Sequence, residues 1–108
     1  MSGGGGDGPW PETPALVPCE LVDFETTVWS PQPSVVLKLQ IGQILQVDLE
    51  EEGEVRRVAV RADGDLVGSL VGTNVASVIR CLQEKVAFGA EVTAVEGGQV
   101  RVRVRPRA

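Results

Sequence analysis

Residues 61–70, RADGDLVGSL, contain the signal that decides the fold of this chain. Asp63 and Gly64 predict a two-residue hairpin turn, because a type I′ turn needs positive φ at both central positions. The turn would join a strand over residues 55–61 to a second strand ending at Leu70. Gly68 interrupts that second strand, which indicates a bulge or a close approach of another backbone segment.

Two more strands are expected before this hairpin. Residues 19–29 and 43–50 alternate between apolar or β-branched and polar side chains, a period typical of half-buried strands. Prolines in residues 30–33 end the first strand because proline lacks the N–H of a sheet ladder. Residues 34–40 are then expected to form one or two helical turns. The inward-facing positions would be Phe24, Thr26, Val28, Leu45, Val47 and Leu49.

Four carboxylates crowd the predicted hairpin tip at residues 50–54, EEEGE. They lack the spaced oxygen ligands of a calcium loop, so we interpret them as a solvated tip. The strand ending at Glu50 is expected to lie beside Arg56 and Arg57. Such cross-strand charge pairs would favour one register by a few tenths of a kcal/mol each.

The last third of the chain predicts one helix and a closing hairpin. Residues 73–86 place apolar side chains at three- and four-residue spacing, with Thr73 or Asn74 as the N-cap. Residues 90–95 and 99–105 then alternate around a Gly97-Gly98 turn. In the final strand, the inner face would carry Val100, Val102 and Val104, and the outer face Arg101, Arg103 and Arg105, with Arg107 just beyond.

Together these elements predict a mainly β (α+β) fold. We expect a small antiparallel barrel or curved sheet of about six strands, with one main helix near residues 73–86. The length of 108 residues fits one domain. We place that domain at residues 19–108, after a flexible arm at residues 1–18 that is rich in glycine and proline. Trp10 in this arm is a candidate either for docking on the domain or for binding a partner, or it packs loosely.

Charge and cysteine content limit the classes of function. The net charge of −5 argues against a general phosphate-binding surface. No apolar run is long enough to cross a membrane, and no leader pattern begins the sequence, so we expect a cytoplasmic protein. Cys19 and Cys81 have no histidine or third cysteine for a zinc site. We expect two buried, reduced thiols, with a disulfide between them as the alternative.

From Ile41 onward the sequence resembles a HIRAN domain, a small β-barrel module of some DNA-repair helicases and of standalone bacterial proteins. The resemblance rests on Gly42-x-x-Leu45-x-Val47-x-Leu49, Val58-x-Val60, Asp63-Gly64-x-Leu66-Val67-Gly68-x-Leu70 and Gly89-Ala90-x-Val92-x-Ala94-Val95-x-Gly97-Gly98-x-Val100-x-Val102. It implies a barrel fold and single-stranded DNA binding. Residues 50–54 stand where the family has an acidic-proline, aromatic and Asn-Ala segment, so its DNA-end contacts have no counterparts here.

The candidate binding residues are Trp10, Arg101, Arg103, Arg105 and Arg107. Three roles are open for the arginines: pairing with Glu91, Glu96 and the acidic tip, binding an acidic protein, or binding nucleic acid. We expect no enzyme, because the chain has no histidine and neither cysteine has an evident base. No cofactor and no metal site are expected. The leading hypothesis is a non-catalytic protein-interaction module, and the alternative is HIRAN-like nucleic-acid binding.

Overall fold

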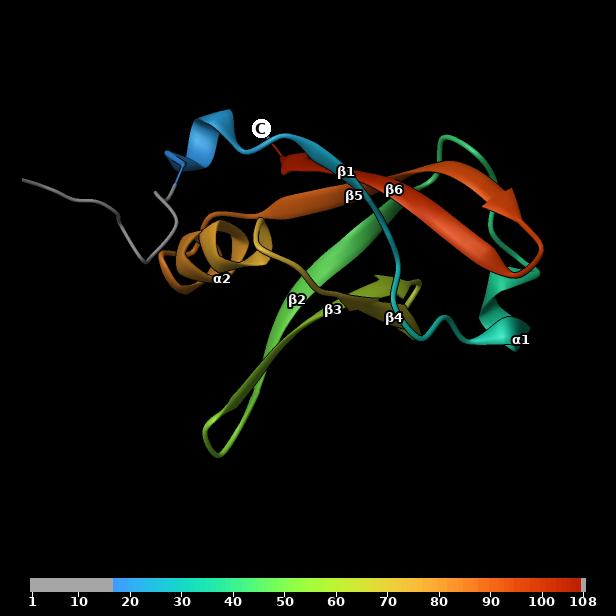
Figure 1. Ribbon diagram of the computed structural model, residues 1–108. Coiled ribbons are helices and arrows are strands. Elements are labelled where there is room, and N and C mark those ends of the chain that lie inside the picture. The colour runs from blue at the N-terminus through green and yellow to red at the C-terminus, as the bar shows by residue number, and fades with distance from the viewer. Residues whose placement is uncertain (1–16, 108) are drawn as a thin grey trace, which may run out of the picture.

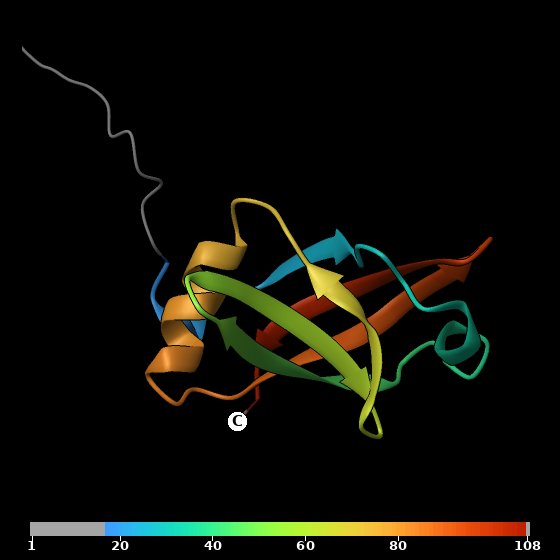
Figure 2. The same ribbon diagram turned by 90° about the horizontal axis from the view of Figure 1, so that it is seen from below.

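The computed structural model describes residues 17–107 and places six antiparallel strands in one strongly curved sheet (Figures 1 and 2). The strand order is β1-β6-β5-β2-β3-β4. This confirms the predicted mainly β fold class. The elements in chain order are η1 (Cys19–Leu21), β1 (Phe24–Thr27), α1 (Pro33–Val36), β2 (Ile44–Glu52), β3 (Val55–Ala62), β4 (Asp65–Leu70), α2 (Val75–Gln83), β5 (Phe88–Glu96) and β6 (Gln99–Pro106).

The hairpin turns follow the predicted chemistry. Asp63 and Gly64 have φ values of 52° and 89°, and Gly97 and Gly98 have 57° and 84°. Positive φ at both central residues is the type I′ requirement on which both predictions rested. In the β2–β3 hairpin the register places Glu50 opposite Arg57 and Glu51 opposite Arg56, which confirms the expected charge pairing.

The N-terminal strand, β1, pairs with the C-terminal strand and leads into a contact with the other edge of the sheet. β1 pairs with β6 on one side. Just beyond β1, Trp29 forms an antiparallel bridge with Ser69 of β4, with N···O distances of 2.8 and 3.0 Å. In Figure 1 the chain leaving β1 crosses to β4 before it enters α1. The two edge strands of the sheet are thus joined at one point, which gives the sheet its barrel-like curvature.

The segment that crosses from β1 packs tightly against Gly68 of β4. This confirms the close backbone approach that was one of the two interpretations of this glycine. A Cβ at Gly68 would lie 2.7 Å from the Trp29 carbonyl oxygen and would overlap Cγ1 of Val28. The absence of a side chain lets the two backbones meet. The β3–β4 ladder also shifts register after Val60.

One face assignment in β5 is wrong. The predicted alternation over residues 90–95 implies that Ala94 shares the face of Val92, but the β5–β6 register shifts between these residues. Val95, instead of Ala94, lies opposite the buried Val100 and packs on the core. A bulge adds one residue to a strand, so it moves every later side chain to the other face.

Valines from every strand except β1 fill the interior, and α2 closes one end of the curved sheet (Figure 2). Val75, Val78 and Cys81 are the buried apolar side chains of this helix, which contacts β2 and η1. Asn74 is its N-cap, without a side-chain hydrogen bond. At the other end of the sheet, α1 contacts β4.

Cys19 and Cys81 form a disulfide, with Cα atoms 5.8 Å apart. The expectation of two reduced, buried thiols is therefore wrong. Spacing of 62 residues gave no indication of the pairing, because it depends on η1 docking against α2. Cys81 is fully buried and belongs to the core face of α2. Within residues 17–107 no helix has the length and apolar character needed to span a bilayer.

Candidate basic groove beside the last strand

The four predicted arginines are all exposed, while the valines between them on β6 are buried. The strict alternation of β6 produces this separation, because successive side chains of a strand point to opposite faces. Arg101, Arg103 and Arg105 lie on β6 itself, and Arg107 follows it. Its backbone N–H donates to the carbonyl oxygen of Ala87 at 2.9 Å, which fixes the chain at the end of the strand.

Neighbouring carboxylates neutralise most of this arginine row. Arg103 makes a two-pronged contact with Asp23, at 2.8 and 2.7 Å. Arg105 bonds to Glu91 at 2.9 Å, and Arg101 lies 3.8 Å from Glu25. Pairing with Glu91 was predicted, but Asp23 and Glu25 of the β1 side take the places assigned to Glu96 and the acidic tip. The tip pairs instead with the arginines of β3.

The Asp23–Arg103 contact shifts the pKa of both side chains. The hydrogen bonds from Arg103 hold the pKa of the Asp23 carboxyl below its usual range, and burial opposes this only in part. The same contact raises the pKa of Arg103. On β2, hydrogen bonds from Arg61 similarly lower the pKa of Glu50. These pairs join β6 to the residue before β1, and β3 to β2.

We expect the Asp23 carboxyl to titrate at lower pH in the folded protein than in the unfolded chain. A lowered folded-state pKa means that the contact stabilises at neutral pH and loses this contribution as the pH falls through that pKa. Carbon-detected NMR of the carboxyl in the wild type and in Arg103→Gln measures the effect. The substitution should return the midpoint to the usual range, whereas equal midpoints would show that Arg103 is not the cause.

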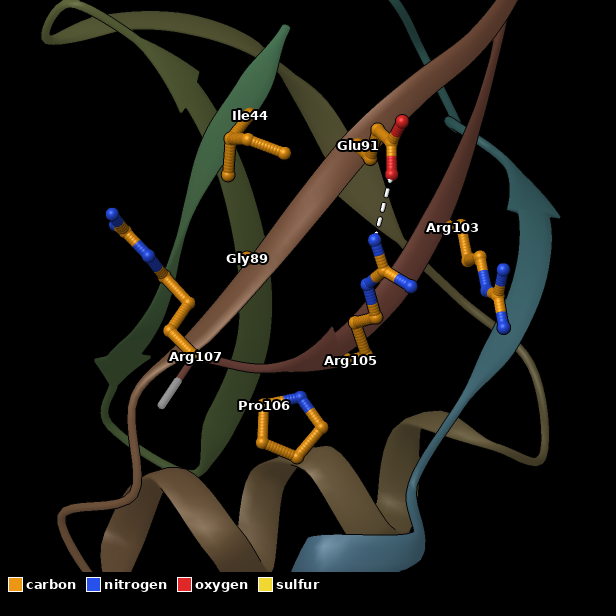
Figure 3. Close-up of a pocket in the computed structure, with 7 residues that line it drawn as sticks. All are labelled: Ile44, Gly89, Glu91, Arg103, Arg105, Pro106 and Arg107. Carbon is orange, nitrogen blue, oxygen red and sulfur yellow. Dashed lines mark hydrogen bonds and ion pairs between the residues drawn. The ribbon is translucent and has the colours of Figure 1, made fainter. Parts of the chain in front are cut away.

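Arg107 differs from the other three arginines because no carboxylate lies within ion-pair distance of it in residues 17–107. Figure 3 shows its side chain running beside Gly89 toward Ile44. A Cβ at Gly89 would lie 3.1 Å from Cγ of Arg107, so the bare glycine makes room for the arginine stem. Together with Pro106 these residues line a hollow of about 220 Å³. In the same view Arg103 points away toward β1, and Arg105 points to Glu91.

A second hollow, of about 540 Å³, adjoins the first, and Ile44 and Arg107 line both. Lys85 lines it, just after α2, and is exposed without an ion pair among the described residues. The backbone of Lys85 is left-handed, with φ of 71°, which ends the helix and places Lys85 beside the second hollow. We call the two hollows together the Arg107 groove and define it by Ile44, Lys85, Gly89, Pro106 and Arg107. The rest of its charged lining consists of Arg61, Arg103, Arg105, Asp48, Asp63 and Glu91.

No protein-family model matches the chain, and comparison with curated proteins and with solved structures gave no match. The site is therefore interpreted from its own geometry.

Ile44, Lys85 and Gly89 were missed as site residues. The signal for Ile44 was present, because it is an apolar residue on the otherwise polar face of β2 and remains half exposed. Lys85 and Gly89 gave no such signal, since only the folded chain brings the end of α2 and the start of β5 beside Arg107. Trp10 lies outside the described residues. Within those residues, no three potential ligands among His, Cys, Asp and Glu come together as a metal site.

Proposed function

We propose that this protein is a non-catalytic protein-interaction module that binds an acidic, partly apolar segment of a partner in the Arg107 groove. The observation that carries the proposal is the placement of the cations without ion pairs. In residues 17–107 only Lys38, Lys85 and Arg107 lack a carboxylate partner at ion-pair distance, and two of these three line the same groove.

The groove offers a carboxylate two cations and an apolar contact in one place. An incoming carboxylate at Arg107 would not have to displace an ion pair formed within residues 17–107, unlike one arriving at Arg103 or Arg105. Ile44, 50% exposed, gives an adjoining apolar side chain a surface to cover. Five cations and three carboxylates line the two hollows, so positive charge is in excess there. On a protein of net charge −5, this local surplus of positive charge favours acidic segments by complementarity.

Charge reversal at the groove should weaken such binding. The probe is an acetylated peptide of alternating glutamate and leucine. Its binding is monitored through the amide NMR shifts of the protein at low and at physiological ionic strength. We expect salt-sensitive shifts at residues 44, 85 and 107. Lys85→Glu combined with Arg107→Glu should lower the affinity about tenfold, which corresponds to about 1.4 kcal/mol.

Lys38→Glu is the matched control, because Lys38 is also exposed and unpaired but follows α1 at the far end of the sheet. It should change the affinity by less than about twofold, since screening removes most of the interaction at that distance. Equal loss in Lys38→Glu would show that only net charge matters, and an absence of shifts near the groove at either salt concentration would refute the proposal.

A second candidate is single-stranded nucleic-acid binding of HIRAN type through Arg101, Arg103, Arg105 and Arg107. The exposure of all four on one side of β6 favours it. Phosphates would, however, have to compete with Asp23, Glu25 and Glu91 for three of these side chains. Oligothymidylate titrated under the same conditions distinguishes the two functions. Shifts along residues 99–107 that exceed those given by the acidic peptide would favour the nucleic-acid function.

A further inference from the structure

The first described residue lies on α2, the helix that ends just before Lys85 of the Arg107 groove. Val17, the first described residue, is held on α2: its N–H donates to Oγ of Ser77 at 3.1 Å, and its carbonyl oxygen accepts from Arg80 at 2.6 Å. η1 follows directly and packs against β6. Figure 1 shows η1 next to the end of β6, where the C-terminus is marked. Val17 and η1 thus lie on α2 and β6, the two elements that lead into Lys85 and Arg107.

The sequence of that segment matches the chemistry of the groove. Residues 1–16 contain the carboxylates Asp7 and Glu12 and no lysine or arginine, and Trp10 stands two residues before Glu12. Measured from Val17, an extended chain reaches at most about 17 Å at Glu12 and about 24 Å at Trp10. Prolines on both sides of Trp10 favour an extended backbone, which makes this reach available.

We propose that residues 10–12 of the same chain occupy the Arg107 groove, with the Glu12 carboxylate at Arg107 and the Trp10 ring on Ile44. This inference rests on the proposed function, since it assigns the groove an internal ligand of the acidic, apolar class. A partner segment then binds by displacing the chain's own segment. Tethering helps the internal ligand: a short flexible connection gives an effective concentration on the order of 1 mM, so even a weak contact is substantially occupied.

Occupation of the groove by the chain's own segment would also set the affinity that a partner needs in order to bind. The apparent affinity of an external ligand falls in proportion to the fraction of groove that is free. A partner must therefore either bind more tightly than the segment or carry several acidic residues. The segment acts as a built-in competitor that keeps weakly acidic proteins out.

The test uses the full chain and needs no partner. Isotope-edited nuclear Overhauser spectra should show contacts between the indole protons of Trp10 and the methyl groups of Ile44. Trp29 serves as an internal reference, because its ring is exposed and its backbone is fixed at Ser69. Glu12→Lys and Arg107→Glu should each abolish the Trp10 contacts, and the double charge swap should restore them. Lys38→Glu should leave them intact.

The acidic peptide then separates this inference from the function on which it rests. If the segment occupies the groove, Trp10→Ala combined with Glu12→Gln should raise the peptide's affinity about three- to tenfold by freeing the site. Absence of the Trp10–Ile44 contacts, together with unchanged peptide affinity in that variant, would overturn the internal ligand while leaving the groove's function in place. No peptide binding in any variant, with the contacts present, would overturn the proposed function alone.

Discussion

Gly68→Ala is expected to destabilise the fold by about 3 kcal/mol or more, a large effect for the addition of one methyl group. The new Cβ would lie 2.7 Å from the Trp29 carbonyl oxygen and would overlap Val28. One of these obstacles is backbone that itself bonds to Ser69, so it cannot move aside without breaking the bridge that joins the two sheet edges. Chemical denaturation monitored by circular dichroism gives the change in the free energy of unfolding.

Gly89→Ala is the matched comparison. Gly89 also lies in a strand at negative φ, but its nearest obstacles are side-chain atoms and not backbone, Cγ2 of Ile44 at 3.0 Å and Cγ of Arg107 at 3.1 Å. These flexible groups can shift by a few tenths of an ångström, so the loss should be well under half of that in Gly68→Ala. Similar losses in both variants would show that β-sheet strain in general, and not the crossing at Trp29, sets the requirement for glycine.

Reduction of the Cys19–Cys81 disulfide is expected to have the second large effect. The bond spans 62 residues, and closing a loop of that size restricts the unfolded chain by about 4 kcal/mol on the chain-entropy model. For a domain of this size, the melting temperature should fall by roughly 20 °C. Differential scanning calorimetry with and without dithiothreitol, accompanied by a thiol count, measures the change.

A variant without both cysteines provides the control for reduction. Cys19→Ala combined with Cys81→Ala should melt at the same temperature with and without reductant. It is expected to be less stable than the oxidised wild type, partly because Cys81 is fully buried and its replacement leaves a small cavity. If the wild type melts at an unchanged temperature although both thiols are counted as free, the bond contributes nothing to stability.

Local chemistry made most of the strands predictable. The Asp63-Gly64 and Gly97-Gly98 turns and the alternation of β2 and β6 depend on neighbouring residues, so the sequence contains their signals directly. The first strand was predicted too long, because residues 19–21 form the turn of η1 and β1 covers only Phe24–Thr27. The bulge in β5 broke an alternation that looked regular, since the residues of a bulge need no special type.

Three further features that sequence analysis missed depend on distant contacts. The disulfide, the Trp29–Ser69 bridge and the pairing of Arg103 with Asp23 join residues 40 to 80 positions apart. The candidate site was predicted in part for the same reason. Arg107 was recognised from the period of β6. Its lack of an ion pair within residues 17–107, and the approach of Lys85 and Ile44, follow from how α2, β2 and β5 pack.

The pairing of β1 with β6 has a consequence for biosynthesis. During translation β1 emerges early, at residues 24–27, yet its ladder partners are residues 101–104. The β2–β3, β3–β4 and β5–β6 hairpins can each form as soon as both of their strands have left the ribosome. β1, in contrast, must remain unpaired until β6 is complete. Likewise, Cys19 cannot form its disulfide until Cys81 has been synthesised. Closure of the sheet is thus a late event with a large loop to overcome, which predicts slow final folding. A chaperone that shields residues 19–29 on the nascent chain would act at the step where the protein is most exposed to misfolding.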